Sequence, residues 1–208
     1  QSLDVLVDSH DAVVLAAGTL SGNRLDVQGA NLPGVEHGLE FLMMVNEQGR
    51  QRIGSNVVVI GGGYTAMDCA RTAIRLGAET AVYYRRGSQD MVVLPGEVQE
   101  LLNETGSMNY FKTPSQFRGV QSIQQVSLAN TSIHTERGKP IIRIDTGSSI
   151  DIDVDSVILA TGQTADTDWI SGRVREAILN EQGDVSVVQG ALTPDPKVFM
   201  AGDFATGA

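Results

Sequence analysis

The sequence contains a single cysteine, Cys69, among its 208 residues. One cysteine cannot form a disulfide, a four-cysteine zinc site or an all-cysteine iron–sulfur site within this chain. The three histidines, His10, His37 and His134, are scattered and lack the spacing of metal ligands. The sequence therefore predicts no metal site, and we expect Cys69 to be a small buried residue rather than a redox group.

Long apolar runs and an excess of basic residues are also missing. No run approaches the roughly 18–20 apolar residues of a spanning helix, and residues 1–8 lack the pattern of a signal peptide. The 15 Lys and Arg against 25 Asp and Glu give a formal net charge of −10. This field disfavours nucleic acids and anionic membranes, so we expect neither as a partner. A reducing, cytoplasmic location is compatible with this composition.

One of the glycine-rich stretches has a distinctive context. Residues 57–60 (VVVI) are typical of a buried strand in a parallel sheet. Gly61-Gly62-Gly63 follows directly, and apolar residues recur at helical spacing from Ala66 to Ile74. A further strand is expected at residues 80–84. The unit of about 30 residues has the size of a βαβ motif.

Three residues of this stretch, Gly61, Gly63 and Ala66, match the dinucleotide-binding pattern G-x-G-x-x-G/A. Gly61 permits a tight turn, Gly63 lets a pyrophosphate approach the backbone, and Ala66 lets the helix pack close to the strand. Backbone N–H groups and the helix dipole then face the phosphates, and Thr65 can add a hydroxyl donor. The alternative is a glycine-rich turn with a purely structural role.

The end of the second strand indicates which nucleotide binds. An NAD site has an acidic residue there, which accepts hydrogen bonds from the adenine ribose. Here the strand ends in Tyr83-Tyr84-Arg85-Arg86. Guanidinium groups match the charge and geometry of a phosphate, so Arg85 and Arg86 predict the 2′-phosphate of NADPH. The alternative is that both arginines are ordinary solvated charges.

The remaining elements are expected from hydrophobic patterns and turn residues. Helices are expected at residues 38–48 and 96–104, and buried strands at 11–16, 157–160 and 198–201. Alternation at residues 116–128, 140–146 and 150–153 predicts an antiparallel meander. The near-copies LAAGT at residues 15–19 and LATGQ at 159–163 suggest two related nucleotide-binding lobes.

Four motifs in order resemble one known family: DAVVLAAGT with LPGV, then VVVIGGGYTAMDCARTAIRLGA followed by YRR, then VDSVILATGQ, then VFMAGDFATGA. The family is the small (beta) subunit of NADPH-dependent glutamate synthase. The same wider group includes the flavin–NADPH region of dihydropyrimidine dehydrogenase and the NADPH-dependent ferredoxin reductases. The resemblance covers nearly the whole chain.

The resemblance implies an α/β fold with two interleaved dinucleotide domains. A Rossmann-like NADPH-binding domain at residues 30–165, with a parallel sheet and a small antiparallel meander, is inserted into a second Rossmann-like domain. Residues 1–29 and 166–208 are then fragments of that FAD-binding lobe. The implied cofactor-binding residues are Gly61, Gly62, Gly63, Tyr64, Thr65, Ala66, Arg85, Arg86, Ala160, Thr161 and Gly162 for NADPH, and Gly202 and Asp203 for FAD.

The implied function is transfer of hydride from NADPH to FAD and of electrons onward to iron–sulfur centres. The expected partners are the remainder of the flavoprotein chain and an iron–sulfur or large catalytic subunit. No catalytic side chain is expected, because the cofactors carry the reactive atoms. The family's flavin fingerprint and N-terminal cysteines are absent, and Tyr64 stands where the family has Asp or another polar residue. We therefore expect an excised NADPH-binding fragment that holds FAD poorly and is inactive alone.

Three alternatives stay open at this point. The chain could be a non-catalytic module that senses a nucleotide, or a subunit of an NADPH:ferredoxin-type reductase. A methyltransferase ranks last, because that class has an acid where this chain has Arg85 and Arg86. The shared module does not specify the final electron acceptor, since that depends on other segments.

Overall fold

The computed structural model describes residues 2–49, 53–180, 183, 185 and 192–207. The chain divides into two compact units. The larger unit is Arg24–Thr161, and the smaller unit combines Gln1–Asn23 with Gly162–Ala208. Within the described residues no helix is long and apolar enough to cross a membrane.

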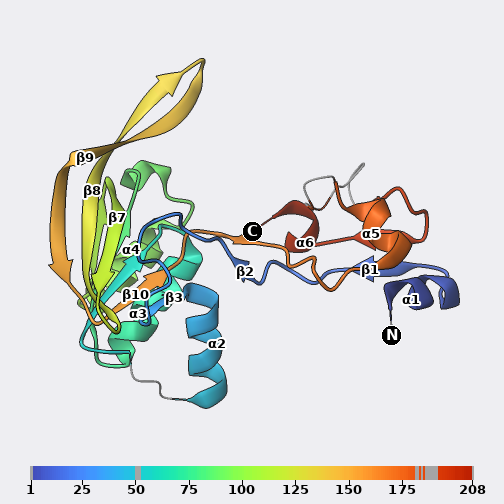
Figure 1. Cartoon of the computed structure of the whole chain (residues 1–208), viewed down its shortest axis with the longest axis horizontal. Helices are drawn as coiled ribbons and strands as arrows, with labels where there is room; N and C mark the ends of the chain where they lie inside the picture. Colours follow the sequence, from blue (N-terminus) through green and yellow to red (C-terminus); the bar gives the residue numbers. More distant parts are fainter. Residues whose placement is uncertain (1, 50–52, 181–182, 184, 186–191, 208) are drawn as a thin grey trace. The chain divides into compact units, whose positions relative to one another are not determined.

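A five-stranded parallel sheet forms the centre of the larger unit (Figure 1), with the strand order β3-β10-β4-β5-β6. The strands are β3 (Val35–His37), β4 (Asn56–Ile60), β5 (Glu79–Tyr84), β6 (Ser107–Tyr110) and β10 (Ser156–Leu159). The strands predicted at residues 57–60, 80–84 and 157–160 are confirmed. The short β3 and β6 were not predicted, because neither contains a run of apolar residues.

Three helices contribute to the core on one face of this sheet: α2 (Gly38–Gln48), α3 (Tyr64–Arg75) and α4 (Pro95–Asn103). Phe41, Met67 and Leu101 of these helices are fully buried with Val57 and Val59 of β4. The 12-residue α3 is stabilised because Met67, Ala70 and Ala73 lie on one face of the helix and are buried in the core. The helices predicted at residues 38–48 and 96–104 are thus confirmed.

A three-stranded antiparallel sheet contributes to the core on the opposite face: β7 (Lys112–Gly119), β8 (Ile123–Glu136) and β9 (Lys139–Asp153). The predicted meander is confirmed, but two of its boundaries were wrong. The stretch 116–128 crosses the turn between β7 and β8. The two stretches 140–146 and 150–153 belong to one strand, β9, whose polar middle is a bulge: Ala129 pairs with Ser149, and the next residue, Asn130, pairs with Asp145.

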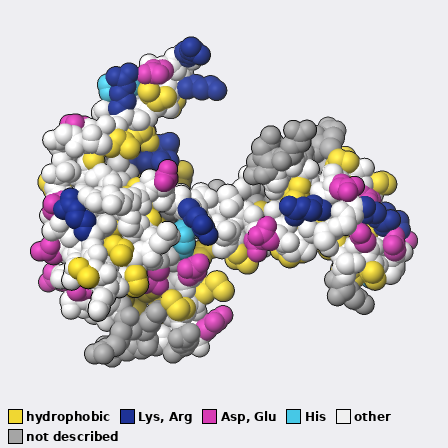
Figure 2. Space-filling view, viewed as in Figure 1, with side chains coloured by type: hydrophobic (Ala, Val, Ile, Leu, Met, Phe, Trp, Pro, Cys, Tyr) yellow, Lys and Arg dark blue, Asp and Glu magenta, His cyan; other side chains and the backbone are white. Residues whose placement is uncertain are grey.

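The β8–β9 hairpin continues beyond Lys112, the first residue of β7, as a two-stranded projection, residues 131–145, which we call the arm (Figure 1). Lys and Arg side chains gather at the end of the arm (Figure 2). Most of the arm's residues are exposed.

The smaller unit contains a parallel pair of strands, β1 (Val13–Leu15) and β12 (Val198–Met200), and an antiparallel pair, β2 (Ser21–Gly22) and β11 (Gln163–Thr164). Its helices are α1 (Leu3–Ser9), α5 (Gly172–Ile178) and α6 (Asp203–Thr206). The predicted strands at 11–16 and 198–201 are confirmed in shorter form. The α/β class, with a parallel sheet and an antiparallel meander, is confirmed.

Candidate nucleotide-binding site

The candidate site lies where the strand order of the parallel sheet reverses. From β4 the chain passes to β5 and then β6 on one side, and β10 returns to pair with the other side of β4. Ligands of open α/β sheets bind at such a switch point, beyond the carboxyl ends of the strands. Gly61–Gly63 follow β4 and Ala160 and Thr161 follow β10, so the fold brings these predicted residues together.

At the first two positions of the turn, neighbouring atoms leave no room for a Cβ, so only glycine fits there without displacing them. Gly61 has φ +152°, and its N–H donates to the Tyr83 carbonyl oxygen at 3.0 Å. A Cβ on Gly61 would lie 2.2 Å from the carbonyl oxygen of Ala160. A Cβ on Gly62 would lie 2.5 Å from the ring of Tyr84. A side chain at Gly61 would therefore push the backbone after β10 away from β4, and one at Gly62 would displace the ring of Tyr84.

The third glycine is different, because a Cβ on Gly63 would meet no atom within 4 Å. Gly63 is the N-cap of α3 and supplies no side-chain cap to the helix. The first turn of a helix carries N–H groups without intrahelical partners and the positive end of the dipole. Tyr64 begins the helix with a side chain that is 48% exposed, and Ala66 is fully buried. An open backbone of this kind can bind a pyrophosphate.

Two arginines, Arg85 and Arg86, follow the neighbouring strand β5. The register pairs Ile60 with Tyr83, which sets the segment Arg85-Arg86 beside the glycine turn. Arg85 is exposed and Arg86 is half-buried. Over the part of the chain that the structure describes, neither guanidinium takes part in an ion pair. Both positive charges are thus available to a ligand.

The backbone of this arginine segment is held by residues that sequence reasoning missed. The Thr131 hydroxyl donates to the Arg85 carbonyl oxygen at 2.9 Å, and the Phe111 N–H donates to that of Arg86 at 3.3 Å. Thr131 stands 46 positions from Arg85, so no local signal in the sequence could have connected them.

The loop after the arginines is closed by Asp90. Its carbonyl oxygen accepts a hydrogen bond from the Tyr84 hydroxyl at 3.0 Å, and its carboxylate accepts one from the Gly87 N–H at 3.0 Å. Tyr84 was identifiable only as the last residue of the predicted strand. Its ring contact with the Gly62 position needed the tertiary structure.

The three remaining predicted residues belong to the smaller unit. Gly162 has φ +104°, and its carbonyl oxygen accepts a hydrogen bond from the Asn23 N–H at 3.0 Å. Gly202, with φ +64°, is the N-cap of α6, and Asp203 is the first residue of that helix; both are exposed. They occupy the same position after their strand as the glycine turn does after β4.

Cys69 is buried in α3, and its thiol donates to the Gly38 carbonyl oxygen at 3.5 Å. Burial, aided by the nearby charge of Asp68, raises the pKa of the thiol to about 12. A neutral thiol is a poor nucleophile, so Cys69 acts as the small core residue that the sequence predicted.

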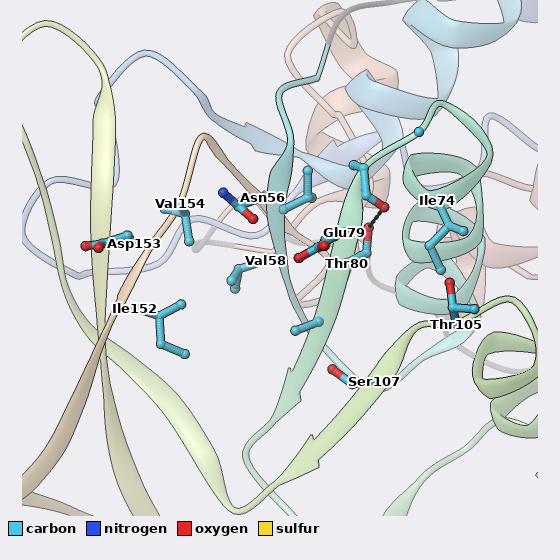
Figure 3. Close-up of a pocket in the computed structure, with 14 residues that line it drawn as sticks. Asn56, Val58, Ile74, Glu79, Thr80, Thr105, Ser107, Ile152, Asp153 and Val154 are labelled. Carbon is cyan, nitrogen blue, oxygen red and sulfur yellow. Dashed lines mark hydrogen bonds between the residues drawn. The ribbon is translucent and has the colours of Figure 1, made fainter.

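A groove of about 610 Å³ lies at the opposite edge of the parallel sheet (Figure 3). It is lined by the first residues of β4, β5 and β6 and by the end of β9. Because the glycine turn follows the carboxyl end of β4, this amino-edge groove is separate from the nucleotide site. This groove is thus not where the sequence motif lies.

The sequence is similar to known proteins over nearly its whole length. A family model described as pyridine nucleotide-disulphide oxidoreductase matches residues 5–208. The chain is 31% identical to the small chain of NADPH-dependent glutamate synthase of Escherichia coli (strain K12), over 99% of this chain and 48% of the relative. It is 30% identical to the beta subunit of an NADP(+)-dependent formate dehydrogenase of Moorella thermoacetica, over 100% of this chain and 30% of the relative. The chain therefore spans half or less of the length of these relatives.

Solved structures share the fold. FprA from Mycobacterium tuberculosis in complex with NADPH superimposes with a TM-score of 0.76 at 17% identity, covering 99% of this chain and 60% of FprA. Thioredoxin reductase from T. acidophilum superimposes with a TM-score of 0.70 at 19% identity, covering 95% of this chain and 58% of that enzyme.

Proposed function

Because the chain belongs to the pyridine nucleotide-disulphide oxidoreductase family, we propose that it is the NADPH-binding portion of a flavin-dependent oxidoreductase. The observation that carries the proposal is an open glycine turn beside two arginines, at the end of the next strand, that form no ion pair among the described residues. The turn offers N–H donors to a pyrophosphate, and the arginines offer charge to a further phosphate.

Each predicted residue has a role in this proposal. Residues 61–66 bind the pyrophosphate, and Arg85 and Arg86 bind the 2′-phosphate of the adenine ribose. The segment Ala160-Thr161-Gly162 closes the nicotinamide end. Support comes from the switch point between β4 and β10, which sets Ala160 against the Gly61 turn.

The domain assignment is part of the same proposal. The NADPH-binding domain, at residues 30–165, overlaps the larger compact unit, residues 24–161. Residues 1–29 and 166–208 contribute to an FAD-binding lobe, in which Gly202 and Asp203 contact the flavin cofactor. Support comes from the second parallel strand pair, β1 and β12, with its own glycine turn into α6.

In the intact protein, NADPH would supply a hydride to FAD, and the electrons would pass on to iron–sulfur centres on other segments or subunits. The chain's own contribution is to bind and orient the nucleotide. Two relatives support a partner of this kind, because their names describe them as a small chain and a beta subunit.

Replacement of the arginines tests the nucleotide assignment. Arg85→Ala and Arg86→Ala are each expected to weaken NADPH binding by about 10–100-fold, because each removes a hydrogen bond to a charged phosphate. NADH lacks the 2′-phosphate, so its affinity should change little. Titration of both nucleotides by calorimetry measures the two effects.

Arg118→Ala is the matched control, because Arg118 pairs with Asp151 on the meander sheet and lies outside the site. It should leave both affinities unchanged. Equal affinities for NADPH and NADH that neither site variant alters would reject the assignment. Flavin content of the full-length gene product tests the second part, and a protein without flavin would favour a nucleotide-sensing module.

A further inference from the structure

The arm has two chemically different faces. Cross-strand partners in an antiparallel hairpin share a face. The register pairs Thr131 with Ile144, Ile133 with Ile142, and Thr135 with Pro140, so one face carries no charge. The other face pairs Ser132 with Arg143, His134 with Ile141, and Glu136 with Lys139.

The uncharged face is incompletely covered within the larger unit. Ile144 is 54% exposed, Thr135 and Pro140 are exposed, and Ile133 and Ile142 are only half-buried. A two-stranded hairpin is marginally stable by itself in water and needs a packing partner. Exposed apolar side chains on such a projection indicate a surface for another protein.

The arm also differs in charge from the rest of the chain. It carries three of the 15 Lys and Arg residues but only two of the 25 Asp and Glu residues. Arg143 pairs with Glu136, and in the structure as described Arg137 and Lys139 at the turn have no ion-pair partner. The arm is therefore a locally basic projection on a strongly acidic chain, and its turn is complementary in charge to a locally acidic surface.

The amino-edge groove offers the complementary surface. Ile74 and Ile152 are its half-buried apolar residues, above the buried Val58 and Val154, and its charged side chains are the exposed Glu79 and Asp153 (Figure 3). No Lys, Arg or His is among the residues that line it. The groove thus combines apolar surface with negative charge, as the arm combines apolar surface with positive charge.

The placement of the two features permits a closed dimer. The arm leaves the larger unit at the carboxyl edge of the parallel sheet, where Thr131 contacts Arg85 and Phe111. The groove lies at the amino edge. In a dimer with a twofold axis and antiparallel sheets, the arm of each copy would point toward the amino edge of the other copy. With about seven residues per strand, the arm reaches about 24 Å.

We infer that the arm of one copy of this chain binds in the amino-edge groove of a second copy. The two arm–groove contacts would be equivalent and would together form the interface of a homodimer. This inference does not rest on the nucleotide proposal, because neither the groove at the amino edge nor residues 132–144 of the arm is assigned to the nucleotide site.

Charge reversal tests the inference on the 208-residue chain by analytical ultracentrifugation at roughly 100 µM, where micromolar affinities are visible. The wild-type chain is expected to be a dimer. The arm variant, Arg137→Glu with Lys139→Glu, and the groove variant, Glu79→Lys with Asp153→Lys, should each be monomeric. An equimolar mixture of the two variants should dimerise again, because each reversed arm then meets a reversed groove and each native arm a native groove.

A separate pair of variants tests the apolar contact. Ile142→Asp on the arm should abolish the dimer, whereas Val120→Asp, at an exposed turn of the same sheet, should not. Thermal unfolding of each variant shows that the larger unit remains folded. A monomeric wild-type chain, variants that remain dimeric, or folded variants that stay monomeric when mixed would each overturn the inference.

Discussion

Gly61 and Gly63 are two residues apart, yet an added methyl group would meet very different surroundings. At Gly61 it would overlap the Ala160 carbonyl oxygen, and the φ of +152° disfavours any side chain. At Gly63 it would enter open space, with φ at −97°. The fold therefore needs the first glycine but not the second, and our proposal assigns the second to the ligand.

This difference predicts opposite behaviour for two alanine variants. Gly61→Ala should lower the free energy of unfolding by about 1–3 kcal/mol, from overpacking and backbone strain. Gly63→Ala should leave the unfolding transition unchanged but weaken NADPH binding roughly tenfold or more, because its methyl occupies the space of the pyrophosphate. Urea unfolding and nucleotide titration separate the two effects. A destabilised Gly63→Ala protein would contradict the prediction.

Cys69 gives a prediction in the alkaline range. Its pKa rises from 9.0 to about 12 on burial. Between these values the unfolded chain loses the thiol proton and the folded chain keeps it, so the unfolded state binds fewer protons and stability falls as pH rises. Below pH 9 both states keep the thiol proton, so the full stability of the folded state with a neutral Cys69 is present there.

The matched variant Cys69→Ala removes this titration. Between pH 8 and pH 11, the stability of the wild-type chain in urea should fall more steeply than that of Cys69→Ala. Parallel pH profiles for the two proteins would contradict the raised pKa.

At the scale of elements, Thr131, where β8 enters the arm, positions the arginine segment that follows β5. The Thr131 hydroxyl is the hydrogen-bond donor in this contact, and its side chain is buried. Loss of the hydroxyl would leave the Arg85 carbonyl oxygen without this donor and allow the segment to shift. Specificity for NADPH would then depend on a residue that does not contact the nucleotide.

Two substitutions at this position test that dependence. Thr131→Val keeps the shape and removes the hydroxyl, and it should weaken NADPH binding by about 3–10-fold with little change for NADH. Thr131→Ser keeps the hydroxyl and should restore most of the affinity. Equal losses for both nucleotides would indicate a general structural role instead.

At the scale of the whole molecule, the larger unit contains its own parallel sheet and two apolar clusters, one on each face. It also contains every residue assigned to NADPH except Gly162. Residues 24–161, expressed alone, should therefore bind NADPH within roughly threefold of the affinity of the 208-residue chain. A shortened chain that folds but binds more than tenfold more weakly would show that the smaller unit contributes to this site.

The sequence by itself determined the strand–turn–helix unit at residues 57–75, because the information for it is local. Val57–Ile60 has the continuous apolar pattern of a buried strand, the glycines follow without a gap, and the apolar residues of α3 recur at helical spacing. Arg85 and Arg86 could be predicted for the same reason, because they directly follow the predicted strand at residues 80–84 in the sequence.

Only the tertiary structure decided what surrounds these residues. Contacts of Gly61 with Ala160, and of Arg85 with Thr131, join positions that lie far apart in the chain, and their pairing depends on strand order and register. The same holds for the short strands β3 and β6, which exist because neighbouring strands supply hydrogen bonds. The arm likewise follows from where β7 begins to pair with β8, and the amino-edge groove follows from where the end of β9 meets the parallel sheet. No local pattern in the sequence specifies either position.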